Sequence, residues 1–210
     1  MTSATHRRAR SASAKAQRSQ DILAAARALA TARPVREITL TDVAAEVGLH
    51  KSAMLRYFET REQIFLALAA DGWREWIAEA RAGLGDPGEV AGILAHSLAS
   101  RPLFCDLLAQ APLNLERNVS LEVVRDYKTS TLAALTPLVS DLRRMLSLTE
   151  QQVFDVISTA TSMAGALWQM AAPGTTLRAF YESNPDLAHA IVDVEPRLTR
   201  ILTALLAGMR

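Results

Sequence analysis

Apolar residues recur three or four positions apart along most of the chain, and this spacing limits the folds open to it. Residues so spaced share one face of an α-helix, whereas a half-buried strand alternates apolar and polar residues. Helical stripes begin near Gln17, and no stretch shows strict alternation or a hairpin turn between β-branched runs. A Thr followed three positions later by Asp or Gln, the pattern of a capping box, marks helix starts at Thr39, Thr60 and Thr149. The sequence therefore predicts an all-α fold.

Proline and glycine residues indicate where these helices end, because neither continues a helix well. A first helix is expected from Gln17 to Arg33, before Pro34, followed by short helices after Thr39 and over residues 51–58. The remaining expected helices are 60–83, 89–100, 102–110, a long helix capped by Ser120 and kinked at Pro137, 149–172, and 185–208 with Asn184 as its N-cap and Pro185 in its first position.

Charge is divided unevenly along the chain. Residues 1–61 carry eleven Lys or Arg against five Asp or Glu, a balance of +6, whereas residues 62–210 carry twelve against seventeen, a balance of −5. This asymmetry suggests that only the N-terminal part meets a polyanion. Within that part, residues 1–16 are basic and rich in Ser and Ala without an apolar period, and we interpret them as a disordered basic arm.

Three further features favour a cytoplasmic protein. The longest apolar run, Ile64 to Ala70, is too short to span a membrane, and no apolar stretch follows the basic N-terminus as it would in a secretory signal. The single cysteine, Cys105, fits a reducing compartment and is interpreted as a buried apolar side chain rather than a reactive thiol.

The segment 39–58 has the features of a helix-turn-helix. Ala44 allows two short helices to cross closely, and Gly48 supplies the positive φ of a tight turn. The apolar residues that fill the angle between the helices are Val43, Val47, Leu49, Met54 and Phe58. The outer face of the second helix carries Lys51, Ser52, Ala53, Arg56 and Tyr57. This set suits phosphate and base-edge contacts in the major groove, while the alternative is a helical hairpin inside an ordinary core.

This segment resembles the DNA-binding head of the tetracycline-repressor (TetR) family. The resemblance extends over about residues 17–77, and the stretches that carry it are 39–44 (TLTDVA), 47–50 (VGLH), 54–58 (MLRYF) and 61–64 (REQI). It implies a three-helix DNA-binding domain over 17–77 and a helical ligand-binding and dimerisation domain over 78–210. The DNA-contacting residues it implies are Thr39, Lys51, Ser52, Ala53, Tyr57 and Arg61, of which Thr39 and Arg61 would hold phosphates. Arg56 is added as a DNA contact because it lies on the outer face of the second helix.

This sequence departs from the family pattern at three positions. His50 replaces the usual Ser cap, and a neutral His is a poorer N-cap. Leu55 stands where the family commonly has a phosphate-contacting Tyr, and Arg61 replaces the usual Lys. Our hypothesis is that Arg56 and Tyr57 supply what Leu55 lacks.

The resemblance also implies how the C-terminal body is used. The last two helices, 149–172 and 185–208, are expected to pair with those of a second copy as a four-helix bundle, with Gly165 allowing close approach. The alternative is that their apolar stripes serve only the core of one chain. The candidate ligand contacts are Trp73, Trp76, Phe104, Tyr127, Met163 and Trp168, which suit an apolar or aromatic ligand, although side chains of these types more often belong to a plain core.

The expected function is a DNA-binding transcriptional regulator, a repressor released from a palindromic operator by a small ligand. The alternatives are a DNA-binding or interaction protein that senses no ligand and a small helical enzyme. Catalysis is not expected, because no cluster of catalytic groups is evident. Neither a metal nor a cofactor is expected, because the four histidines are scattered. The Gly83–Gly88 stretch matches a dinucleotide-binding spacing, but a helix precedes it and Pro87 interrupts it.

Overall fold

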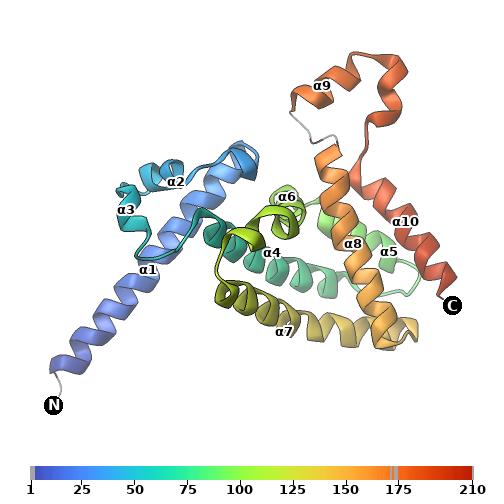
Figure 1. Ribbon diagram of the computed structural model, residues 1–210. Coiled ribbons are helices and arrows are strands. Elements are labelled where there is room, and N and C mark those ends of the chain that lie inside the picture. Colours follow the sequence, from blue (N-terminus) through green and yellow to red (C-terminus); the bar gives the residue numbers. More distant parts are fainter. Residues whose placement is uncertain (1–2, 171, 173–174, 210) are drawn as a thin grey trace.

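The computed structural model describes residues 3–170, 172 and 175–209, and these residues form helices and turns without a strand. The α-helices are α1 (Ser3–Ala32), α2 (Leu40–Glu46), α3 (Lys51–Met54), α4 (Arg61–Gly83), α5 (Val90–Ala99), α6 (Pro102–Gln110), α7 (Leu121–Leu146), α8 (Glu150–Met170), α9 (Thr176–Glu182) and α10 (Val194–Gly208). Helices α1 to α3 form a head at one end of the molecule, and α4 runs from it into a body built from α5 to α8 and α10 (Figure 1). The predicted all-α fold is confirmed. None of the described helices combines the length and apolarity needed to cross a membrane.

Helix α1 begins at Ser3, so residues 3–16 are helical, whereas the sequence predicted a disordered arm over residues 1–16, of which residues 1–2 lie outside the described residues. The interpretation as an arm rested on the missing apolar stripe. Residues 3–16 contain neither Gly nor Pro and are rich in Ala and Arg, both strong helix formers. Buried Ile22 and Ala26 anchor the later turns of α1 against the head core. Elongating an anchored helix avoids the unfavourable nucleation step, so propensity alone extends it.

The connection between α3 and α4 is tighter than expected, because α3 ends at Met54 rather than at Phe58. Beyond Met54 the backbone closes with bonds of 3₁₀ type, from Arg56 N to the Ala53 carbonyl at 3.2 Å and from Tyr57 N to the Met54 carbonyl at 2.9 Å. Such bonds tighten the end of a helix. They turn the chain so that the Phe58 side chain enters the core, where it is 8% exposed.

The body is built around α4. Helix α4 packs against α1, α5, α6 and α7, while α6 packs on α8 and α5 packs on α10. The apolar stripe of α4 continues from the head into the body, from Ile64 and Phe65 to Trp76 and Ile77. One hydrophobic core therefore extends through both parts of the chain.

The last helix begins later than expected, so the predicted helix 185–208 is wrong. The chain instead forms α9, a 3₁₀ turn over Pro185–Ala190 and then α10 from Val194. The Asn184 side chain makes no N-cap bond and donates to the Phe180 carbonyl at 2.7 Å. Pro196 explains the difference, because in a helix starting at 185 its ring would clash with an interior carbonyl. In α10 it lies in the first turn, where no backbone N–H is needed.

Gly165 serves the core of a single chain rather than the dimer contact assigned to it from the sequence. A Cβ added there would lie 2.9 Å from the Ala109 backbone nitrogen and 3.3 Å from the Cys105 carbonyl oxygen, both on α6. Backbone atoms cannot move aside as a flexible side chain can. Gly165 therefore sets the distance between α6 and α8.

We expect Gly165→Ala to lower the free energy of unfolding by about 1–3 kcal/mol, because overpacking forces α6 away from α8. The matched control is Gly92→Ala in α5, where an added Cβ meets nothing within 4 Å. That variant should keep its stability or gain up to about 1 kcal/mol from helix propensity. Urea unfolding followed by circular dichroism measures both, and equal midpoints for the two variants would contradict the assigned contact.

Candidate nucleic-acid interface

The start of α2 is fixed by the predicted capping box. The Thr39 hydroxyl accepts a bond from Asp42 N at 3.2 Å, and Asp42 Oδ2 accepts bonds from Thr39 N at 2.7 Å and from the Thr39 hydroxyl at 2.9 Å. These bonds, with Arg33 at 3.0 Å, lower the pKa of Asp42 below its usual value. The carboxylate therefore stays ionised at neutral pH and keeps the box closed. The phosphate contact expected of Thr39 stays a prediction. In this structure the Thr39 hydroxyl donates to Asp42, so it would have to leave that bond to donate to a phosphate.

The turn between α2 and α3 is formed as expected. Gly48 has a φ of 65°, and Leu49 N donates to the Ala44 carbonyl at 2.8 Å. Ala44 is 2% exposed, as the close crossing of α2 and α3 requires. His50 caps α3 through Nδ1, which accepts from Ser52 N at 3.4 Å and lies 2.9 Å from the Ser52 hydroxyl oxygen. His50 thus replaces the usual Ser cap, over a longer backbone bond.

The outer side of α3 and its following turn faces solvent. Lys51, Ser52 and Arg56 are exposed, whereas Ala53 and Tyr57 are half-buried. Met54, on the inner side, has no exposed surface. The structure therefore brings all five predicted groove-facing residues together on one short segment, with both cations open to a ligand. Leu55, at 54% exposed, lies among them and adds an apolar contact surface.

Arg61 is placed differently from the expected phosphate contact. Its guanidinium donates to the carbonyls of Val35 and Ile38 and to Glu62 Oε1, and it lies 4.7 Å from the Phe65 ring centre. Only 13% of the side chain is exposed. A phosphate contact would require Arg61 to give up these bonds. In this structure Arg61 holds the α1–α2 connection, residues 33–39, against α4.

A second residue holding this connection was missed by the sequence analysis. Asp106, on α6 and 6% exposed, accepts a bond from Val35 N at 2.8 Å and from Gln169 Nε2 at 2.7 Å. The available signal was an acid alone in the apolar run 103–108, which usually indicates a buried carboxylate with partners. The partners themselves lie 71 and 63 residues away along the chain.

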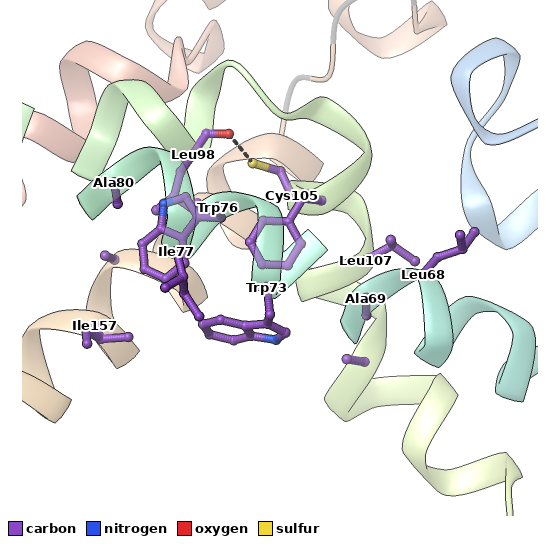
Figure 2. Packing of buried hydrophobic residues seen from close by; sticks show 14 of the residues in the cluster. Leu68, Ala69, Trp73, Trp76, Ile77, Ala80, Leu98, Cys105, Leu107 and Ile157 are labelled. Carbon is purple, nitrogen blue, oxygen red and sulfur yellow. Dashed lines mark hydrogen bonds between the residues drawn. The ribbon is translucent and has the colours of Figure 1, made fainter. Parts of the chain in front are cut away.

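Four of the six candidate ligand contacts form an aromatic cluster in the body core. The Trp73 ring centre lies 5.6 Å from that of Trp76 and 5.5 Å from that of Phe104, in edge-to-face geometry. Figure 2 shows Trp73 and Trp76 among the buried residues of α4, α5 and α6. Trp73 Nε1 donates to the Tyr127 hydroxyl at 3.1 Å, and burial raises the pKa of Tyr127 to about 12. Met163 and Trp168 are half-buried on α8.

A cavity of about 560 Å³ lies elsewhere in the body, between the end of α4, α5 and α10. None of the six candidate ligand contacts lines it. Its lining includes Glu79, Glu89, Ile93, His96 and Glu195. The acidic side chains make this cavity more polar than the aromatic cluster.

We expect the Cys105 thiol to be unreactive in the folded protein. Its Sγ donates to the Leu98 carbonyl at 3.2 Å (Figure 2), and burial raises the pKa of the thiol to about 12. The reactive thiolate is therefore nearly absent at pH 8. A disulfide reagent such as Ellman's should react with the native protein only as fast as it unfolds, and at once in guanidinium. Rapid native labelling would contradict this placement.

Comparison with known proteins agrees with this architecture. Residues 22–68 match the family model of bacterial regulatory proteins of the tetR family, and residues 69–210 match the tetracyclin repressor-like C-terminal domain. No curated protein matches the sequence.

Solved structures share the fold at low sequence identity. FadR from Thermus thermophilus, a TetR-family transcriptional repressor in complex with lauroyl-CoA, is 20% identical, with 91% of this chain and 95% of that chain covered at a TM-score of 0.58. RolR in complex with resorcinol is 17% identical, with 92% and 96% covered at a TM-score of 0.54. A TetR/AcrR-family regulator from Thermobifida fusca is 19% identical, with 92% and 99% covered at a TM-score of 0.55.

Two family models thus account for both the helix-turn-helix head and the helical body that carries it, and the chain belongs to the TetR family of DNA-binding transcriptional regulators.

Proposed function

We propose that the protein is a dimeric repressor that binds a palindromic operator and is released by a small molecule. The observation that carries the DNA-binding part is the solvent-facing side of α3, where Lys51, Ser52 and Arg56 are exposed on a segment fixed by a helix cap and a glycine turn. Positive side chains beside a small residue suit the major groove, because they reach phosphates and base edges without a steric block.

The proposed dimer contact uses α8 and α10, which pack against each other in one chain. Their solvent-facing sides are lined by small residues at helical spacing, Ser158, Ser162 and Ala166 on α8 and Ala204 and Ala207 on α10. Small side chains allow two helix pairs to approach closely. A dimer places two heads on half-sites about 34–36 Å apart or a multiple of that distance. The second helix of the proposed contact is therefore α10, which replaces the helix predicted over residues 185–208.

The proposed effector is apolar or aromatic. The Thermus thermophilus FadR structure holds lauroyl-CoA and the RolR structure holds resorcinol, so related folds accept an acyl chain and a phenol. Trp73, Trp76, Phe104, Tyr127, Met163 and Trp168 remain the proposed contacts. Because four of them are packed in the core, an effector has to open the aromatic cluster to reach them. The body then has two conformations, one with the aromatic cluster closed and one with it open, and the effector binds only the open one. Release from DNA depends on such a difference in effector affinity between two conformations.

Selection of bound duplexes from random DNA by the purified protein tests the proposal. We expect enrichment of a palindrome, matching a two-fold dimer. Light scattering should give about twice the chain mass of 22.8 kDa. A monomeric mass at micromolar concentration, or no enriched sequence, would contradict it. Enrichment of a palindrome combined with DNA affinity that ignores every compound bound by the body would favour a ligand-independent DNA-binding protein.

A further inference from the structure

We propose that Asp106 is a positioning residue that couples the α1–α2 connection of the DNA-binding head to the C-terminal end of α8. Each carboxylate oxygen binds a different part of the molecule, since Oδ2 accepts from Val35 N in the head and Oδ1 accepts from Gln169 Nε2 on α8. The proposal concerns contacts within one chain. It bears on gene regulation only through the proposed use of α8 as a dimer helix.

The burial of Asp106 argues for a positional role. A carboxylate that is only 6% exposed loses most of its hydration, and hydrogen bonds must replace it. An apolar side chain would fill the same space without that penalty. The carboxylate instead fixes the relative position of two segments, because donors from both of them bind the oxygens of one rigid group.

The α1–α2 connection is held from two sides. Arg61 of α4 binds the carbonyls of Val35 and Ile38, while Asp106 of α6 binds the Val35 N–H. The Val35 side chain is itself fully buried. This connection leads directly into Thr39 and α2, so its position sets where α2 and α3 lie relative to the body.

Helix α6 is packed tightly against α8, and this contact connects α8 to the α1–α2 connection through Asp106. Gly165 of α8 lies against the α6 backbone at Ala109, one turn beyond Asp106, and Gln169 lies one turn beyond Gly165. A shift of this end of α8 cannot leave α6 in place without straining a backbone contact or breaking the Gln169 bond. The shift therefore reaches Val35 through contacts between packed elements, as coupling between distant sites requires.

The test is to change α8 and observe the head. In Gln169→Glu the new carboxylate faces Asp106 Oδ1 and the donated hydrogen is lost. We expect exchange of the Val35 amide hydrogen, followed by NMR on the full-length protein, to accelerate about tenfold, the size of effect that loss of a charge-assisted bond produces. In the double variant Asp106→Asn/Gln169→Glu, the amide at position 106 donates to the carboxylate at 169 and still offers its oxygen to Val35 N–H. Exchange should return to near the native rate.

The matched control is Gln151→Glu, which introduces the same carboxylate on the same helix. Gln151 donates to Asp155 Oδ1 at 3.0 Å, so this variant creates a similar repulsion at an exposed place away from the head. Val35 exchange should not change in the control. Unchanged exchange in Gln169→Glu, no recovery in the double variant, or acceleration shared by amides throughout α4 and α8 would each overturn the coupling.

DNA binding supplies a second, separate readout. Affinity for the duplex obtained by random selection should fall in Gln169→Glu and recover in the double variant, while the dimer mass stays constant. If no duplex is selected, the proposed function fails, yet the amide-exchange experiment still decides the coupling. If DNA binds but its affinity is the same in all variants while Val35 exchange changes, the coupling exists and its link to operator binding is overturned.

Discussion

Trp76→Ala should lower the free energy of unfolding by about 3–5 kcal/mol, the range found for removing a buried aromatic side chain. Trp76 has no exposed surface and packs against Trp73 and Phe104. Its Nε1 donates to the buried Ser97 hydroxyl at 3.0 Å, so truncation leaves both a cavity and an unpaired acceptor. Because the remaining neighbours come from separate helices, they cannot all collapse into the space.

The matched control is Trp168→Ala, which removes the same side chain from a half-buried position on α8. Trp168→Ala should lower the free energy of unfolding clearly less than Trp76→Ala does, because the half-buried side chain buries less apolar surface. Guanidinium unfolding followed by far-ultraviolet circular dichroism avoids the loss of a tryptophan signal. Equal losses in the two variants would show that the aromatic cluster does not form the centre of the body.

Arg56→Ala and Lys51→Ala should each weaken DNA binding about tenfold or more, because a well-placed cation contributes about 1–3 kcal/mol. The two possible roles of each cation are distinguishable. Loss of a phosphate contact weakens all duplexes alike and reduces the salt slope by about 1, whereas loss of a base contact relaxes preference at one position. Fluorescence anisotropy with the selected duplex, over a range of salt concentrations, measures both quantities.

The control for these variants is Arg144→Ala, which removes one positive charge from an exposed position on α7. It tests whether net charge alone lowers the affinity. Lys51 and Arg56 are exposed, so circular dichroism should show unchanged helix content in all three variants. Native affinity in both Lys51→Ala and Arg56→Ala would refute the proposal that residues 51–57 contact DNA.

The features predicted correctly from the sequence are those set by nearby residues. Thr39 and Thr149 each form the expected capping box, with Asp42 and Gln152. Thr60 also caps its helix, although the Gln63 side chain reaches back to Glu59 N instead of Thr60 N. Each of these contacts spans at most four positions along the chain, so a local pattern contains all the information needed.

The features that were missed depend on contacts between distant segments. The bonds of Arg61 to carbonyls 23 and 26 residues earlier are visible only in the folded chain, and the DNA contact expected of Arg61 stays a prediction. Gly165 was assigned to a dimer because a small residue allows close approach without indicating which helix approaches. The late start of α10 has a local cause, because Pro196 favours a helix that begins just before it over one that begins at Pro185.

Helix α4 belongs to the head and the body at once, and this affects how the protein can be divided. The two family models meet between residues 68 and 69, inside the uninterrupted helix Arg61–Gly83. Cutting there would expose Phe65 and Leu68 on one fragment and Trp73 on the other, so neither fragment would keep a closed interior. Head and body should consequently melt as a single cooperative unit, and a fragment intended to isolate the DNA-reading part needs the whole of α4 together with whatever covers its apolar side.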